Sequence, residues 1–214
     1  MPKLFNEEVQ NQLKEILSQT KEKITLVLFT KEGTCPTCSE TKQLLEEVSE
    51  LSNNVVLEVK DLEKDKELAK EYGITLTPSF VILDAKGNYK GVKFNGIPAG
   101  HEINSFVSAL LEMSGITPKF QENVLKRIQN IKKPVNIKVF VTLGCPHCPG
   151  AVQNAHRLAM LNENIEGEMI EAQTFAEISN KFNVSGVPKI VINDEHEFVG
   201  NQPIETYLEQ LENL

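Results

Sequence analysis

The sequence lacks the features of several common protein classes. Its 214 residues include no tryptophan and only four cysteines, which are too few for a secreted scaffold held together by disulfides. No apolar run approaches the roughly 18 to 20 residues that span a bilayer. Met1–Glu8 lacks the basic and apolar segments of a secretory signal. A net charge of −8 argues against a dedicated nucleic-acid binder, which normally has a basic face. We therefore expect a cytoplasmic protein that binds neither membranes nor nucleic acid.

The four cysteines form two Cys-x-x-Cys pairs, CPTC at Cys35 and Cys38 and CPHC at Cys145 and Cys148. In a reducing compartment such pairs indicate either metal ligation or redox catalysis. A zinc site made by all four would have to bring together two pairs that are separated by 106 residues. Zinc-binding pairs also normally lie in turns rather than after a buried strand. We therefore predict redox chemistry and no metal site.

An internal repeat relates the two halves of the chain with an offset of 110 residues. The offset aligns the two cysteine pairs and carries Pro78 onto Pro188, so that each proline follows the first cysteine of its pair by 43 residues. This regularity predicts two equivalent units, residues 1–115 and 116–214. No low-complexity linker separates them, and we therefore expect the units to pack against each other.

Each unit contains the same order of predicted elements. An amphipathic helix is followed by a β-branched strand, the cysteine pair, a second helix, another strand, a short helix, a proline-led strand, a hairpin strand and a final helix. The first strands cover 24–29 and 135–140, and the second strands cover Val55–Asp61 and Ile165–Glu171. The apolar residues assigned to the first helices are Leu4, Val9, Leu13, Ile16 and Leu17 in one unit and Phe120, Val124, Ile128 and Ile131 in the other.

This arrangement resembles the thioredoxin fold, in which a strand, a Cys-x-x-Cys pair that opens a helix and a proline-led strand follow in that order. Two such units with both pairs intact resemble the glutaredoxin-like protein disulfide oxidoreductases of thermophilic prokaryotes. Segments 94–102 (FNGIPAGHE) and 139–149 (VFVTLGCPHCP) look much like that family, and the likeness covers nearly the whole chain. It implies an α/β architecture of tandem thioredoxin-like folds, each a mixed central sheet flanked by helices, with the units packed together.

A related arrangement is the N-terminal domain of bacterial flavin-dependent peroxiredoxin reductases. That domain is similar in its two-unit layout but typically keeps only the second cysteine pair. The present sequence has both pairs and carries no dinucleotide-binding fingerprint. The resemblance to the stand-alone oxidoreductases is therefore favoured.

The chemistry expected of the cysteine pairs is thiol–disulfide exchange, which needs an exposed thiolate and a second thiol that resolves the mixed disulfide. At the start of a helix, unpaired N–H groups and the helix dipole stabilise a thiolate. The proline inside each motif suits the first helical turn. We therefore expect Cys35 and Cys145 to attack, and Cys38 and Cys148 to resolve. The oxidised pairs are the disulfides Cys35–Cys38 and Cys145–Cys148.

Pro78 and Pro188 follow Thr77 and Val187 in the sequence. The family likeness implies a cis peptide bond before each proline. It also implies that Thr77 and Val187 offer their backbone to an extended substrate segment beside the active sulfurs, which gives broad specificity. The alternative is a proline that merely begins an edge strand, and the matched spacing of the two prolines favours the substrate-binding role.

Three further residues are candidates for tuning the thiols. His147 lies inside the second pair, where its positive form favours a thiolate and makes the disulfide a better oxidant. The second couple is therefore predicted to be the more oxidising one and to face the substrate. Glu58 and Glu168 each follow their pair by 20 residues in a largely apolar strand. A carboxylate beneath the active helix could accept the proton of the resolving cysteine, although Glu is also common at an exposed strand position.

The sequence thus predicts an enzyme without a cofactor that reduces, forms or isomerises protein disulfides at two sites. The family likeness implies protein disulfide substrates and a thioredoxin-reductase-like flavoenzyme as electron donor, with a peroxiredoxin as a further candidate partner. One alternative is an electron-relay module that feeds a peroxiredoxin from a flavoprotein reductase. The other alternative is a redox-sensing module that binds a partner without turnover.

Overall fold

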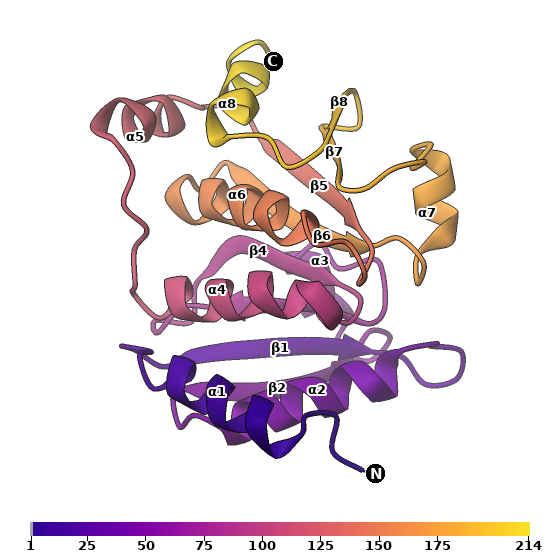
Figure 1. Ribbon diagram of the computed structural model, residues 1–214. Helices are drawn as coiled ribbons and strands as arrows, with labels where there is room; N and C mark the ends of the chain where they lie inside the picture. The colour runs from indigo at the N-terminus through magenta and orange to yellow at the C-terminus, as the bar shows by residue number, and fades with distance from the viewer. Residues whose placement is uncertain (1) are drawn as a thin grey trace.

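The computed structural model describes residues 2–214, which form one mixed sheet of eight strands with helices on both faces (Figure 1). The strands lie in the order β2-β1-β3-β4-β6-β5-β7-β8. Their bounds are Ile24–Thr30 (β1), Val55–Asp61 (β2), Ser79–Leu83 (β3), Tyr89–Asn95 (β4), Val135–Val141 (β5), Ile165–Glu171 (β6), Lys189–Ile192 (β7) and His196–Val199 (β8). The helices are Glu7–Leu17 (α1), Cys38–Glu50 (α2), Lys66–Glu71 (α3), Ile103–Met113 (α4), Glu122–Gln129 (α5), Cys148–Leu161 (α6), Ala176–Lys181 (α7) and Ile204–Glu212 (α8), with a 3₁₀ turn, η1, at Gly100–Glu102.

The direction of the strands places both cysteine pairs on the same side of the molecule, at the carboxyl ends of β1 and β5. In the first unit (α1 to α4), β1 is parallel to β2 and antiparallel to β3, which is antiparallel to β4. The second unit (α5 to α8) repeats this pattern. Because β4 and β6 pair in parallel, β1, β4, β6 and β5 all run in one direction. The loops with Cys35 and Cys145 follow β1 and β5, so both begin at the carboxyl ends of strands that run in one direction. These two strands are four positions apart in the sheet, which is a distance of about 19 Å at the usual strand spacing.

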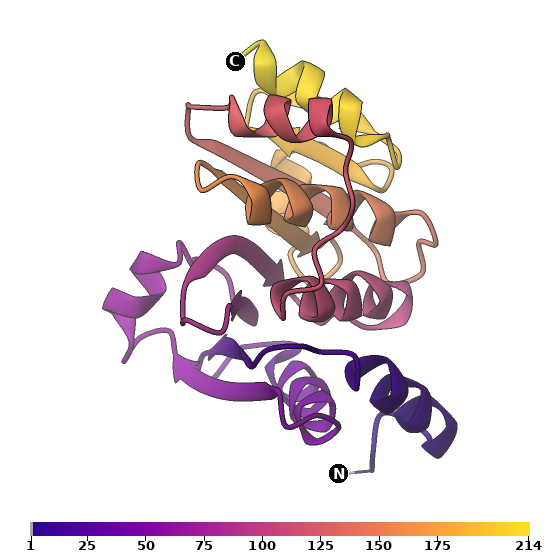
Figure 2. The same ribbon diagram turned by 90° about the vertical axis from the view of Figure 1, so that its left-hand side faces the viewer.

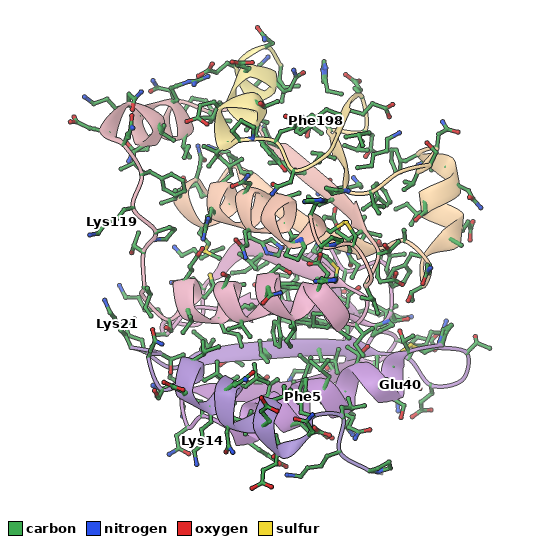
Figure 3. The ribbon with its side chains drawn as sticks, viewed as in Figure 1. Phe5, Lys14, Lys21, Glu40, Lys119 and Phe198 are labelled. Carbon is green, nitrogen blue, oxygen red and sulfur yellow. A yellow bond between two sulfur atoms is a disulfide. The ribbon has the colours of Figure 1, made fainter. Side chains whose placement is uncertain are left out.

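The largest group of buried apolar side chains, here called the main cluster, lies between the sheet and one layer of helices. It takes residues from both units, including Leu44 of α2, Phe106 of α4 and Val152 of α6. Phe5 and Phe198, which are labelled in Figure 3, pack against it near the two ends of the molecule. On the opposite face, α3 and α7 each cover a smaller cluster of their own. Both cysteine-bearing helices therefore share one face of the sheet.

The two units are joined at the seam between β4 and β6. Burial lowers the pKa of His156 in α6 to about 4, so its ring is neutral at pH 7, and its Nε2 donates to the carbonyl of Lys93 in β4 at 3.0 Å. Arg157 donates from two nitrogens to the carboxylate of Glu112 in α4. Figure 2 shows the connection from α4 running past α6 to α5. The prediction that the units pack together is confirmed, whereas the boundary between residues 115 and 116 stays a prediction.

Most predicted elements are found close to their predicted bounds. Strands β2 and β6 begin and end as predicted, and β1 and β5 are each one residue longer. The first helices are shorter than the apolar pattern indicated. The side-chain oxygen of Asn6 accepts from the N–H of Val9 and caps α1, so Leu4 lies outside the helix, and Phe120 and Ile131 likewise flank α5. Within residues 2–214, no helix is both long and apolar enough to cross a membrane.

Candidate redox site

Each cysteine pair closes a disulfide in the loop between a central strand and a helix. The Cα atoms of Cys35 and Cys38 are 5.5 Å apart, as are those of Cys145 and Cys148. The second cysteine of each pair is the first residue of its helix, α2 or α6. The first cysteine and the proline after it therefore precede the helix, and the prediction that these prolines lie in the first helical turn is wrong. The attacking sulfur still lies within one turn of the helix start, where the dipole favours a thiolate.

A cis-proline bond directly precedes β3 in the first unit and β7 in the second. The Thr77–Pro78 and Val187–Pro188 bonds are both cis, as the family likeness implied. The carbonyl oxygen of Val187 lies 3.8 Å from Sγ of Cys145. Among residues 2–214, no other backbone group pairs with the N–H or the C=O of Thr77 or Val187. Because buried or half-buried backbone groups normally have partners, these free groups are suited to an extended peptide.

The two disulfides differ in exposure. Cys35 and Cys38 are both partly exposed, whereas Cys145 is 8% exposed and Cys148 is fully buried. The prediction of an exposed attacking sulfur therefore holds for Cys35 of the first pair, whereas Cys145 of the second pair is buried and the prediction is wrong there. The first unit contacts the loop that leads to the second pair, since the N–H of His101 donates to the carbonyl of Leu143, two residues before Cys145.

The structure corrects the predicted orientation of Glu58 and Glu168. In β6, a Cβ atom on Gly167 would lie 2.6 Å from a backbone oxygen of α6, so its neighbour Glu168 points to the opposite face of the sheet. There its carboxylate accepts from the side-chain amides of Asn95 and Asn136 at 2.8 and 2.7 Å. Glu58 occupies the same face of β2.

Glu58 is exposed and forms a 3.1 Å ion pair with Lys60. Both glutamates therefore lie across the sheet from the helices that bear the cysteines. The expectation that they point beneath the active helices is wrong. Alternate residues of a strand point to opposite faces of the sheet, so either set could have faced the cysteine-bearing helices. The apolar pattern of β2 and β6 did not show which set does so.

A buried carboxyl that the sequence analysis did not single out lies in η1. Glu102 is fully buried, its Oε2 is bonded to the hydroxyl of Ser105, and its Oε1 has no partner. Burial raises its pKa to about 7. The η1 turn packs against α6, the helix that begins with Cys148. A glutamate directly before an apolar helix was the available signal, but it is equally typical of an exposed first turn.

His147 and the two cysteine pairs are not arranged as a metal site. His147 is exposed at the N-cap position of α6, and Thr37 takes the equivalent place before α2. The roughly 19 Å between the two cysteine loops is too far for four sulfurs to bind one ion, since a zinc–sulfur bond is about 2.3 Å long. In the described part of the chain, no three His, Cys, Asp or Glu side chains are grouped so that they could hold a metal.

Comparisons with known proteins agree with the repeat. A family model described as a thioredoxin-like domain matches residues 9–108, and one described as a thioredoxin domain matches residues 135–213. The alkyl hydroperoxide reductase AhpF of Staphylococcus aureus (strain Mu50) is 32% identical over 208 residues, which are 97% of this chain and 38% of that protein. The chain thus spans about two fifths of the length of the curated relatives it matches.

Two solved structures are similar over nearly the whole chain. One is the alkylhydroperoxide reductase AhpF of Enterococcus faecalis, in its C503A mutant, with a TM-score of 0.91, 32% identity and coverage of 97% of this chain and 99% of that one. The other is a protein disulfide oxidoreductase from Aeropyrum pernix, with a TM-score of 0.89, 28% identity and coverage of 96% and 91%. The predicted tandem thioredoxin-like fold is confirmed.

Proposed function

Because this chain belongs to the family of two-unit thioredoxin-fold proteins that includes protein disulfide oxidoreductases and the N-terminal domain of the alkylhydroperoxide reductase AhpF, we propose that it catalyses thiol–disulfide exchange at two sites. One observation carries the proposal. Each disulfide follows a central strand, each unit has a cis-proline bond preceded by a residue with free backbone groups, and at the second site the carbonyl oxygen of that residue, Val187, lies 3.8 Å from Sγ of Cys145. That geometry suits an extended protein segment that carries a disulfide.

The reaction follows from the arrangement of the second site. In the reduced site, the thiolate of Cys145 attacks one sulfur of a substrate disulfide, and the other substrate sulfur leaves as a thiolate that takes up a proton. The thiolate of Cys148 then attacks Sγ of Cys145 and releases the first substrate sulfur. The substrate gains two electrons and two protons, and the site is left as the Cys145–Cys148 disulfide. Cys35 and Cys38 take the same roles at the first site.

We propose Glu102 as the proton acceptor in this sequence. Cys148 must lose its proton before it can attack, and a buried thiol does so only with a base nearby. Glu102 is buried, belongs to a turn that packs against α6 and has a pKa raised to about 7. A carboxyl with that pKa exchanges protons readily at neutral pH. Glu58 and Glu168 lie across the sheet from the helices that bear the cysteines, so we propose Glu102 in their place.

The direct test uses the full chain and a protein substrate. With dithiothreitol as electron donor, the protein should accelerate the reduction of insulin disulfides, which is followed by precipitation of the freed chains. Cys35→Ser combined with Cys145→Ser should abolish the acceleration, because both attacking sulfurs are lost. Each single substitution should leave part of it. Equal rates for the double variant and the unsubstituted protein would contradict the proposal.

A second candidate function is an electron relay between a thioredoxin-reductase-like flavoenzyme and a peroxiredoxin. The similarity to the alkyl hydroperoxide reductase AhpF favours it. Consumption of a reduced nicotinamide cofactor should then depend on the simultaneous presence of the flavoenzyme, this protein, the peroxiredoxin and peroxide. A module that only senses redox state would instead change its affinity for a partner on oxidation and would accumulate no product in either assay.

A further inference from the structure

The segment Gly96–Gly100, which follows β4 and ends at the first residue of η1, runs from one redox site to the other. At its first end, the N–H of Gly96 donates to the carbonyl of Pro78, the cis-proline of the first site, at 2.9 Å. Just beyond its other end, the N–H of His101 donates to the carbonyl of Leu143 at 3.0 Å. Leu143 lies in the loop that leads to Cys145. The segment is therefore fixed to both sites by its backbone.

The two glycines at its ends permit very close contact with the second unit. A Cβ atom on Gly96 would lie 2.8 Å from Cβ of Glu171, at the end of β6. A Cβ atom on Gly100 would overlap the backbone carbonyl oxygen of Leu143. Both glycines also have positive φ angles, 101° and 57°, which side-chain-bearing residues rarely adopt. The segment thus lies directly against the carboxyl end of β6 and the loop after β5, which leads to the second cysteine pair.

Comparison of the two repeated units shows that only the second site is contacted by such a segment from the other unit. Gly200 is the equivalent of Gly96, since its N–H donates to the carbonyl of Pro188. A Cβ atom on Gly200 would meet only the flexible side chain of Gln202, at 3.3 Å. The sheet ends at β8, so no further unit receives that loop. The first unit supplies one wall of the second site, and no described unit supplies such a wall to the first.

The wall is apolar. Ile97 and Ala99 are half-buried and pack against the main cluster, which includes Cys145 and Cys148, and half-buried Val187 packs against the same cluster. Beside Gly96, the carboxylate of Glu171 is already bonded to the N–H and hydroxyl of Thr174. Because the side chains of Ile97 and Ala99 are uncharged and Glu171 is only 2% exposed, the exposed parts of Ile97 and Ala99 present an apolar surface to anything that docks there.

We propose that Gly96–Gly100 is a substrate-contacting wall of the second redox site, and that Ile97 makes this site prefer substrate segments with an apolar side chain next to the reacting cysteine. The inference rests on the proposed thiol–disulfide exchange function. An extended segment paired with the free backbone of Val187 lies over Cys145. The first unit borders that position where His101 donates to Leu143, in the loop that leads to Cys145. Specificity at the second site is consequently a property of both units together.

The test isolates each site in the full chain. Cys35→Ser with Cys38→Ser leaves the second site, and Cys145→Ser with Cys148→Ser leaves the first. Two disulfide-containing peptides, with Leu or with Asp beside the cysteine, are compared with hydroxyethyl disulfide, which has no peptide backbone to dock. Dithiothreitol regenerates the dithiol, and kcat/KM is measured for each substrate.

In the second-site protein, kcat/KM should be higher for the Leu peptide than for the Asp peptide. Ile97→Thr keeps the branched shape but should lower kcat/KM for the Leu peptide about tenfold relative to hydroxyethyl disulfide, because an apolar contact is lost. The ratio between the two peptides should fall with it. Gly100→Ala, which pushes the segment off Leu143, should raise KM for the Leu peptide. The control is Gly87→Ala, because Gly87 also has a positive φ, 78°, and a Cβ atom there would have no atom within 4 Å. This control should change neither the KM for the Leu peptide nor the ratio of kcat/KM between the two peptides.

Two results would overturn the inference. One is an Ile97→Thr variant whose second site reduces the Leu peptide as well as the unsubstituted protein does. The other is an equal loss for both peptides, which would show a general disturbance in place of selectivity. Failure of the proposed function is distinguishable from both, because the unsubstituted protein would then reduce neither the peptides nor hydroxyethyl disulfide.

Discussion

The Nζ atom of Lys93 in β4 lies 2.5 Å from Oε1 of Glu166 in β6, so an ion pair joins the two units across the seam of the sheet. The lysine side chain is 2% exposed and the glutamate side chain is 28% exposed. Nζ also donates to the carbonyl of Gly73 at 3.0 Å. A buried ammonium is tolerated only when its hydrogen bonds are satisfied, and here the two units satisfy it together.

Glu166→Ala should therefore lower the free energy of unfolding by about 3 kcal/mol, because it leaves a buried ammonium without its carboxylate. Lys93→Met should cost less, since Glu166 reaches solvent and Met fills the apolar part of the site. Urea denaturation of the full chain measures both. Glu122→Ala removes an exposed pair with Lys126 and should cost no more than about 0.5 kcal/mol. Equal losses for Glu166→Ala and Glu122→Ala would show that the pair at the seam contributes no more than a surface pair.

The raised pKa of Glu102 predicts a pH-dependent stability. Its pKa is about 7 in the folded protein, against an ordinary value of 4.5. The folded state therefore binds more protons between pH 4.5 and 7, and the contribution to stability present at low pH is lost as the pH rises through 7. Glu102→Gln should remove that pH dependence. Above pH 7, its free energy of unfolding should be about 3 kcal/mol higher than that of the unsubstituted protein. Chemical denaturation at a series of pH values tests this.

The matched control for Glu102→Gln is Glu163→Gln, since Glu163 is exposed. That control should follow the unsubstituted protein at every pH. Parallel stability curves for Glu102→Gln and the unsubstituted protein between pH 4.5 and 7 would contradict the assignment. If Glu102 also accepts the proton of Cys148, reduction of substrate at the second site should slow in Glu102→Gln while the first site is unaffected.

The difference between the two dipeptides predicts different reduction potentials. His147 and Thr37 occupy the same N-cap position before α6 and α2, and a positive imidazole there favours the thiolate form of its couple. The Cys145–Cys148 couple should therefore be the more oxidising. His147→Thr should lower its potential by about 10 to 20 mV, as expected for a charge effect of less than 1 kcal/mol at an exposed position.

The reciprocal change, Thr37→His, should raise the potential of the Cys35–Cys38 couple by a similar amount. Each couple is titrated against a glutathione buffer with the other pair changed to serine. A second couple that is equal to or more reducing than the first would refute the order. Unchanged potentials in both exchanged variants would show that the dipeptide does not set the difference.

The sequence by itself determined the repeated unit and the chemistry of its motifs. The spacing from cysteine pair to proline and the β-branched strands identify the fold, because these signals depend on local backbone requirements. The bounds of β2 and β6 followed from the same local patterns. The joining of the units into one sheet did not follow, because strand-edge pairing between β4 and β6 is non-local and no residue in either strand specifies its partner.

Only the tertiary structure decided the environment of the polar residues. Glu58 and Glu168 occupy equivalent positions in the repeat, yet Glu58 is exposed on an edge strand while Glu168 is buried where β6 meets β4. Lys93 and Glu102 resemble ordinary surface residues in the sequence but are buried at contacts between the units. The physical reason is that burial is a property of what packs against a residue. A pattern along one strand can fix its alternation, and only the assembled sheet determines which face and which edge are covered.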